Sequence, residues 1–441
     1  MSLSTPEKIR RLQESLYGKA KQEPNCRFHF LYDKVYREDI LAHAYVLSRS
    51  KGGAPGVDGQ TFADIESSGV ERWLGEIARE LRDEEYRPQA VRRVMIPKAS
   101  GVGERPLGIP TIRDRVVQTA AKLVLEPIFE ADFDDAAYGY RPGRNAVKAV
   151  EKVHTALREG RNEVVDADLS KYFDTIPHAE LMKCLSRRIS DGKMLHLIKM
   201  WLKVPVEERD ERGNRRMSGG KKSTRGTPQG GVISPLLANI YINRFLRAFR
   251  MHGLDEKYGA TLVSYADDFV VLCRRGARQV LETIRRWMTR IGLALNEDKT
   301  CVRDGRREPF DFLGYTFGPM YSPRTGGRYL GAAPSKKALQ KLKANIRSQL
   351  RPSNLIPTER IVARLNRTVR GWANYFCYGT VVRTRHIIDL HLEAAVRHFL
   401  RRRHKVKHHG IAEFPRKRIF GELGVVSTLS LPRKRLANAL P

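Results

Sequence analysis

The chain has 441 residues, enough for two or three domains with a substantial hydrophobic core. Its 81 lysine and arginine residues against 49 aspartate and glutamate residues leave a formal net charge of +32. Such an excess favours a polyanionic partner, most simply the phosphates of nucleic acid. No apolar run approaches the roughly 18 residues of a membrane-spanning helix, and residues 1–25 lack the apolar core of a secretory signal. We therefore expect a protein that does not act at membranes.

The five cysteines are scattered and show no paired spacing. This distribution argues against both a disulfide scaffold and a zinc site, and it fits a reducing compartment such as the cytoplasm. The cysteines are Cys26, Cys184, Cys273, Cys301 and Cys377.

The first half of the chain should alternate between helices and hairpins. Residues 1–85 are basic and helical in pattern, interrupted by a glycine-rich loop at 52–59. Two apolar runs on either side of residues 99–104 predict a hairpin, and a helix should follow from Ile112 to about Phe129. The charged segment 207–222 should form an exposed hairpin or loop.

Beyond about Gly331 the composition changes to helix formers rich in lysine and arginine. One amphipathic helix should pack on its neighbours through Ile361, Leu365, Val369, Trp372 and Phe376. Its other face carries Arg360, Arg364 and Arg367, which could contact phosphates. The chain then ends in a basic segment that includes Arg401, Arg402 and Arg403.

Three aspartates are the candidates for chemistry. Asp267 and Asp268 stand between two short apolar runs, a pattern that predicts a hairpin with carboxylates at its turn, and Asp168 ends another apolar run. A surface turn can hold two acids without any function, so the pair alone is weak. If all three carboxylates meet, their repulsion calls for divalent cations, as two-metal phosphoryl transfer requires. The set therefore predicts nucleotide addition with Mg²⁺.

A second candidate segment is the loop 225–235, whose glycines flank Pro228-Gln229 and let the backbone approach a ligand closely. The alternative is an ordinary turn before a helix. Downstream, Lys299 follows a predicted helix, and residues 312–315 form an apolar strand or turn.

Taken together, the motif series from about Gly52 to Thr380 resembles the reverse transcriptases encoded by bacterial group II introns, which are also called maturases. The resemblance implies an α+β fold: a right-hand polymerase whose antiparallel palm sheet bears the Tyr265–Asp268 hairpin, followed by a helical thumb. The matching stretches are residues 96–98, 105–110, 138–146, 227–230, 265–268, 312–315 and 370–376.

The same resemblance implies roles for individual residues. Asp168, Asp267 and Asp268, with the backbone carbonyl of Leu169, would hold two Mg²⁺ ions. A steric gate against ribonucleotides is implied at Phe173, although an ordinary core phenylalanine is the alternative. The residues implied for nucleotide binding are Lys98, Arg105, Phe173, Gln229, Gly230 and Lys299.

Among these, Lys98 and Arg105 would clamp the triphosphate, and Lys299 would donate a proton to pyrophosphate or be a plain surface lysine. Arg141 and Arg144 would hold template phosphates. The primer would be gripped by Phe312, Leu313, Gly314 and Tyr315.

The predicted domains follow the family order. Residues 1–85 form an N-terminal extension and the start of the fingers, and 86–330 the reverse-transcriptase fingers and palm. Residues 331–400 form the helical thumb, or maturase domain, and 401–441 a basic tail that could be a reduced DNA-binding region. No cysteine-pair and histidine pattern of a nuclease domain is visible.

Three functions are compatible with these residues. The first is an RNA-directed DNA polymerase that also binds its group II intron RNA for splicing and retrohoming, with template RNA, primer or target DNA and deoxynucleotides as further partners. A bacterial cytoplasmic location, at the nucleoid or in a ribonucleoprotein, would follow, and a homodimer is left open. The second is the same enzyme recruited to CRISPR spacer acquisition or DNA repair. The third is a non-catalytic RNA-binding splicing factor. The three aspartates argue against it, because a protein without polymerase activity has no need for clustered acids.

Overall fold

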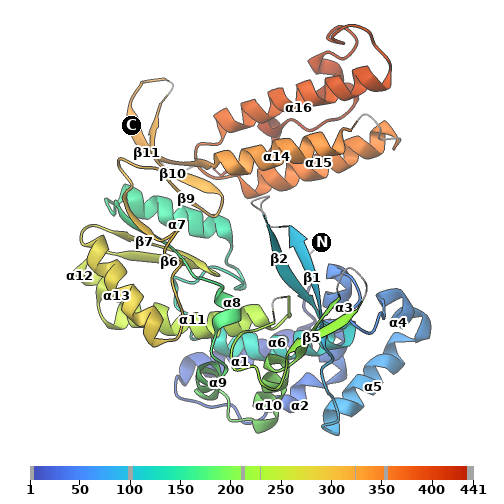
Figure 1. The fold of residues 1–441 in the computed structure, drawn as a ribbon, viewed down its shortest axis with the longest axis vertical. Coiled ribbons are helices and arrows are strands. Elements are labelled where there is room, and N and C mark those ends of the chain that lie inside the picture. The colour runs from blue at the N-terminus through green and yellow to red at the C-terminus, as the bar shows by residue number, and fades with distance from the viewer. Residues whose placement is uncertain are drawn as a thin grey trace.

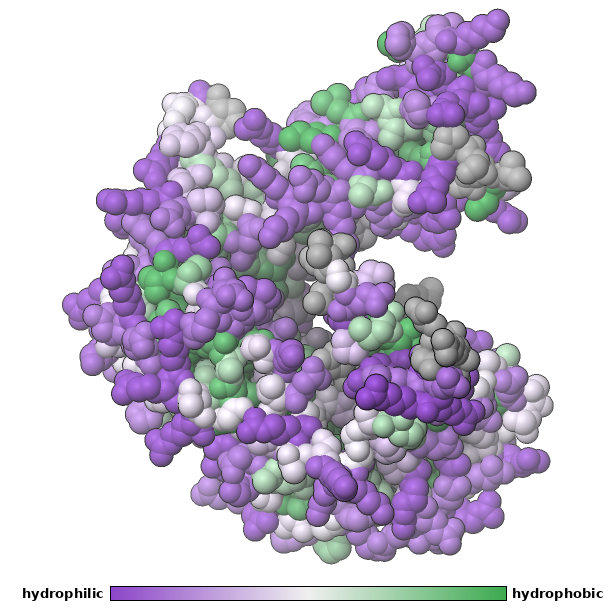
Figure 2. All heavy atoms as spheres, in the orientation of Figure 1, coloured by the Kyte–Doolittle hydropathy of each residue, from purple (hydrophilic) through white to green (hydrophobic). Residues whose placement is uncertain are grey.

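The computed structural model describes residues 4–97, 103–209, 214–228, 230–322, 324–351 and 356–434. In Figure 1 a lower body of helices and sheets continues into an upper helical lobe. Figure 2 shows an open groove between this lobe and the body. Within the described ranges, no helix is long and apolar enough to cross a bilayer.

The N-terminal helices pack with the long helix α6 and belong to the main hydrophobic core, so the predicted helical character of this region is confirmed. α6 begins where Thr111 accepts a hydrogen bond from the Asp114 amide (3.1 Å), a standard N-cap. The elements are α1 (Glu7–Gln22), α2 (Tyr32–Val35), α3 (Glu38–Lys51), α4 (Phe62–Ser68), α5 (Val70–Arg82) and α6 (Ile112–Glu130).

Beside α6 lies a four-stranded sheet in the order β2-β1-β4-β5. Its two outer pairs are antiparallel, while β1 and β4 run parallel. The predicted hairpin around residues 99–104 is therefore present, and segment 207–222, for which a hairpin or a loop was expected, contributes a pair of antiparallel strands. Most of the residues between the strands of each pair lie outside the described ranges. The strands are β1 (Val91–Pro97), β2 (Glu104–Ile109), β4 (Pro205–Arg209) and β5 (Arg215–Gly219).

The central sheet is antiparallel, in the order β6-β7-β3-β8. Buried valines and leucines on its strands pack against α7, α11 and α13, which explains the unbroken apolar runs in the sequence. Its strands are β3 (Glu163–Asp168), β6 (Thr261–Tyr265), β7 (Asp268–Cys273) and β8 (Cys301–Asp304). The helices of this part of the chain are α7 (Ala146–Arg158), α8 (Tyr172–Thr175), α9 (His178–Ser186), α10 (Gly192–Leu202), α11 (Ser234–Met251), α12 (Leu254–Lys257) and α13 (Ala277–Arg290).

A small sheet, ordered β11-β10-β9, joins the body to the upper lobe. Its buried aromatic residues share one hydrophobic cluster with α7 and with Phe376 and Tyr378, which follow the second helix of the lobe. The strands are β9 (Phe310–Phe312), β10 (Tyr315–Tyr321) and β11 (Arg328–Pro334).

The described part of the upper lobe is helical, and the predicted amphipathic helix is α15; the expected boundary at residue 401 falls inside the following helix, α16. Residues after this helix are not a plain basic tail, because Phe414, Ile419 and Val425 are buried in the same core. The buried Arg385 donates to the carbonyl oxygens of Thr428, Leu431 and Pro432. The elements are α14 (Lys336–Gln349), α15 (Thr358–Tyr375), α16 (Val382–Arg403), η1 (Arg418–Glu422) and η2 (Thr428–Ser430).

Candidate functional site

The hairpin of β6 and β7 presents two of the predicted acids. Tyr265 pairs with Asp268, which leaves Ala266 and Asp267 as a two-residue loop. Ala266 has φ +59°, a left-handed conformation that two-residue hairpin loops require and that costs a non-glycine residue about 1 kcal/mol. The turn therefore holds Asp267 at the tip of the hairpin.

The neighbouring strand β3 brings the third acid to the same place. Asp168 lies directly opposite Asp268 in the β3–β7 register. The Leu169 amide donates to the Asp267 carbonyl oxygen (3.1 Å), which fixes the loop against the end of β3. The structure thus brings together the three predicted catalytic acids and Leu169.

Their proximity shifts the acid–base equilibria of the cluster. Protein atoms remove water from the Asp268 carboxyl, and this desolvation, together with the charges of Asp267 and Asp168, raises its pKa to about 7. The pKa of Asp267 is also raised, mainly by desolvation. Such a group of carboxylates is a donor set suited to hard divalent cations, which would relieve the repulsion between them.

Lys299 supplies a positive charge to this cluster. Its Nζ lies 2.9 Å from Oδ2 of Asp168, which also accepts from the Asn296 side chain (3.1 Å). The hydrogen bond to Asp168 raises the pKa of Lys299. With the side chains in these positions, no group of three acidic, histidine or cysteine residues within the described ranges is arranged to hold a metal ion.

One further acid escaped the sequence analysis. Asp166 stands two residues before Asp168, and alternation along a strand places both on the same face. Burial, opposed by Arg303 and reinforced by Asp311 and Asp168, raises the pKa of Asp166 to about 6. Its position in a buried apolar run was the signal that could have identified it.

A cavity of about 880 Å³ opens beside the acids. The exposed Arg105 of β2 and the half-buried Phe173 of α8 line it together with Gly230 and Asp267, so four predicted residues face one space. The lining residues are Glu104, Arg105, Pro106, Leu107, Tyr140, Lys171, Tyr172, Phe173, Asp174, Gly230, Gly231, Ser234, Pro235 and Asp267.

Tyr140 is a cavity residue that the sequence analysis did not single out. Its ring lies edge-on to Phe173, with centroids 6.5 Å apart. Desolvation and the nearby Asp267 raise the pKa of Tyr140. Tyr140 has a left-handed backbone conformation (φ +57°) on a glycine-rich loop. This conformation marks the residue in the structure, but no pattern in the sequence predicts it.

Two glycines allow the loops around the cavity to pack closely. A side chain at Gly139 would place its Cβ 2.6 Å from the Ala266 amide nitrogen, and one at Gly230 would collide with the Gly108 carbonyl oxygen. The backbone of the 225–235 loop was predicted to approach a ligand closely. In the structure it approaches strand β2 closely. Lys98 and Gln229 lie outside the described residues.

The predicted primer-grip segment is a hairpin turn between β9 and β10. Phe312 pairs with Tyr315, and both side chains are buried. Leu313 and Gly314 have φ +50° and +77°, as a tight two-residue turn requires. The side chains of Phe312 and Tyr315 therefore belong to the core, and only the turn itself is left for a ligand.

Arg141, implied as a contact for template phosphates, makes its side-chain contacts within the protein. Its side chain is 4% exposed, pairs with Glu130 and donates to the carbonyl oxygens of Asp134 and Ala137. These contacts occupy the guanidinium group, so Arg141 fixes the loop after α6. Arg144 pairs with Asp135 and lies over the Tyr138 ring, 5.2 Å from its centroid.

The predicted RNA-binding arginines of the upper lobe are only partly accessible. Arg360, Arg367 and Arg402 are exposed, whereas Arg364 and Arg401 are half-buried. Arg364 donates to the Gln349 carbonyl oxygen (3.3 Å), linking α15 to the end of α14. Arg403 donates to the Ile356 carbonyl oxygen (2.8 Å).

Two family models match the chain. The model described as reverse transcriptase (RNA-dependent DNA polymerase) matches residues 96–317, the range that holds the three acids and the cavity. The model described as group II intron, maturase-specific domain matches residues 339–416, which cover most of the upper lobe.

Individual proteins are also similar. Protein YkfC of Escherichia coli is 33% identical over 375 residues, which cover 75% of this chain and 93% of YkfC. The group II intron-encoded protein LtrA of Lactococcus lactis is 36% identical over 223 residues, 49% of this chain and 34% of LtrA. A telomerase structure from Candida albicans aligns with 83% of this chain and 70% of its own chain, at 14% identity and a TM-score of 0.43.

Proposed function

This chain belongs to the group II intron reverse transcriptase and maturase family, and from that premise we propose that it copies RNA into DNA and binds intron RNA for splicing and retrohoming. The meeting of Asp168, Asp267 and Asp268 beside the cavity carries this proposal. In a right-hand polymerase, the central sheet would be the palm, β1–β2 part of the fingers and the upper lobe the thumb.

The three acids would hold two Mg²⁺ ions, which when bound neutralise charge on the reacting phosphates. Arg105, exposed in the lining of the cavity, would bind the triphosphate of the incoming nucleotide. Lys299 stays protonated beside Asp168, the state that a proton donor to pyrophosphate needs.

Phe173 would select deoxynucleotides. Its ring lines the cavity and contacts two aromatic rings, that of Tyr140 with centroids 6.5 Å apart and that of Tyr172 with centroids 5.5 Å apart. A ring fixed in this way would leave no space for the 2′-hydroxyl of a ribonucleotide.

RNA binding would involve the exposed arginines of the upper lobe, Arg360, Arg367 and Arg402. Because phosphate contacts position RNA without reading its sequence, these side chains can hold a folded intron by its backbone.

The test is extension of an oligo(dT) primer on poly(rA) with Mg²⁺ by the purified chain and by Asp168→Asn. We expect extension by the wild type and at most about a thousandth of that rate by the variant. A wild-type protein that extends no primer, or a variant as fast as the wild type, would contradict the polymerase assignment. Splicing of the intron RNA by the same preparations tests the maturase role separately.

A further inference from the structure

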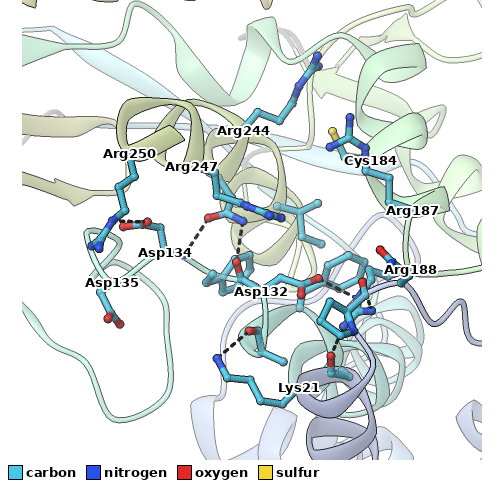
Figure 3. Close-up of a pocket in the computed structure, with 18 residues that line it drawn as sticks. Lys21, Asp132, Asp134, Asp135, Cys184, Arg187, Arg188, Arg244, Arg247 and Arg250 are labelled. Atoms are coloured by element: carbon cyan, nitrogen blue, oxygen red, sulfur yellow. Dashed lines mark hydrogen bonds and ion pairs between the residues drawn. The ribbon is translucent and has the colours of Figure 1, made fainter. Parts of the chain in front are cut away.

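A second large hollow lies between the end of α1, the segment after α6, and helices α9 and α11. It has a volume of about 830 Å³, and Figure 3 shows basic side chains from these elements around it. The cationic lining residues are Lys21, Arg187, Arg188, Arg244, Arg247 and Arg250.

This hollow is distinct from the catalytic cavity, although α11 borders both. Ser234 and Pro235, at the start of α11, line the catalytic cavity, whereas Arg244, Arg247 and Arg250 line the second hollow. At 1.5 Å per residue, Ser234 and Arg247 are about 20 Å apart along the helix axis.

The acids of the hollow are already neutralised. Asp132 pairs with Arg188 (2.9 Å), Asp134 with Arg250 (2.7 Å), and Asp135 with Arg144. An added cation would therefore find no unpaired carboxylate in this lining.

Two cations, in contrast, are available. Arg187 and Arg247 are exposed, and neither forms an ion pair within the part of the chain that the structure describes. Lys21 donates only a long hydrogen bond to the Ala131 carbonyl oxygen (3.4 Å). The hollow thus presents a surplus of positive charge that suits a phosphate-bearing ligand.

The shape of the surface favours a strand over a compact anion. A neighbouring hollow of about 480 Å³ shares Asp134, Asp135 and Arg250 with the first and adds two cations, Arg144 and Lys152, and one acid, Asp255. We call the two together the basic trough. A trough with cations along its length can follow successive phosphates of a single strand.

We propose that the basic trough binds a single-stranded segment of RNA by its backbone, outside the catalytic cavity. This inference rests on the proposed RNA binding and adds a second place for it. The carboxylate of Asp135, 78% exposed, supplies an acceptor for a 2′-hydroxyl, which DNA lacks. The RNA held there would be anchored to the body while the cavity remains free for primer and template.

The test uses the full chain and a fluorescein-labelled U20 RNA, with the dissociation constant measured by anisotropy over a series of KCl concentrations. The variant is Arg187→Gln/Arg247→Gln. Its matched control is Arg278→Gln/Arg290→Gln, two exposed arginines of α13 that also lower the net charge by two. We expect the logarithmic salt slope to fall by about 1.4 in the variant, about 0.7 for each lost phosphate contact, and to stay unchanged in the control.

An unchanged slope in the variant, or an equal fall in the control, would overturn the proposal. Two further arms identify the ligand. In the first, displacement of U20 by inorganic pyrophosphate at an equal phosphate concentration would overturn the assignment to a strand. In the second, dT20 that binds as tightly as U20, with the same fall of the salt slope in the variant, would overturn the assignment to RNA. Failure of the proposed function would appear separately, as a wild-type protein that extends no primer.

Discussion

The two ends of α11 face sites of opposite character. At its start, β3 and the β6–β7 hairpin crowd three acids beside the catalytic cavity, and the pKa of Asp268 rises to about 7 because the carboxylates are desolvated and close to one another. Toward its end, the basic trough holds Asp132, Asp134 and Asp135 in ion pairs and leaves Arg187 and Arg247 exposed.

The difference separates chemistry from affinity. Groups that act on a reacting atom must be held in place by strands and tight turns, and a single change there affects the rate by orders of magnitude. Exposed cations act additively through phosphates, and each contributes a small, salt-dependent increment to binding. Substitutions near the start of α11 should therefore change the rate of primer extension, whereas those toward its end should change RNA binding and its salt dependence.

The largest effect is expected from Asp267→Asn. The substitution keeps the size of the side chain but removes the charge at the tip of the hairpin, so primer extension should fall by about a thousandfold or more. Steady-state extension on poly(rA)/oligo(dT) measures the rate, and U20 anisotropy should show RNA affinity within about twofold of wild type. Extension at an undiminished rate would remove Asp267 from the catalytic group.

A smaller effect, on selectivity, is expected from Phe173→Ala. Loss of the ring opens the cavity wall, and discrimination against ribonucleotides should weaken by roughly ten- to two-hundredfold, the range that one hydrophobic wall can supply. The ratio of kcat/KM for dTTP to kcat/KM for UTP measures this discrimination. Phe173→Tyr keeps the ring and should retain the wild-type ratio; an unchanged ratio in Phe173→Ala would make Phe173 a packing residue only.

The next effect concerns the packing that supports the acids. Gly139→Ala places a Cβ 2.6 Å from the Ala266 amide nitrogen, so the loop or the hairpin must shift, at a cost of about 1–3 kcal/mol in the free energy of unfolding. Urea unfolding measures the change. Gly75→Ala in α5, where a Cβ meets no atom within 4 Å, is the matched control and should be neutral or slightly stabilising. Equal stabilities of the two variants would contradict the close packing.

These contrasts also explain what the sequence could predict. Asp267 and Asp268 are neighbours between apolar runs, and Asp168 ends such a run, so hairpin and strand patterns suffice to propose their meeting. Phe173 and Arg105 likewise belong to short motifs, and both line the cavity. Local patterns succeed where a few adjacent residues determine the geometry.

Features assembled from distant segments were missed. The burial of Arg141 depends on Glu130 and on carbonyl groups of the loop after α6, which composition cannot reveal. The segment after α16 appeared to be a basic tail because its buried residues, Phe414, Ile419 and Val425, follow no regular period. The basic trough draws its cations from helices far apart in the chain, and the sequence shows them only as part of the net charge.

The smallest predicted effect concerns the trough end of α11. Glu180 pairs with Arg244 (3.1 Å) and with Lys183 (2.7 Å) but does not line the trough. Glu180→Gln therefore frees one cation that lines the trough, Arg244, and one that does not, Lys183. The logarithmic salt slope for U20 should rise by at most about 0.7, the contribution of one additional phosphate contact. Glu76→Gln, which releases Arg72 on α5 from a 3.4 Å ion pair, is the matched control and should leave the slope unchanged. A rise in both variants would indicate general electrostatics, whereas a rise confined to Glu180→Gln would locate the extra contact at the trough.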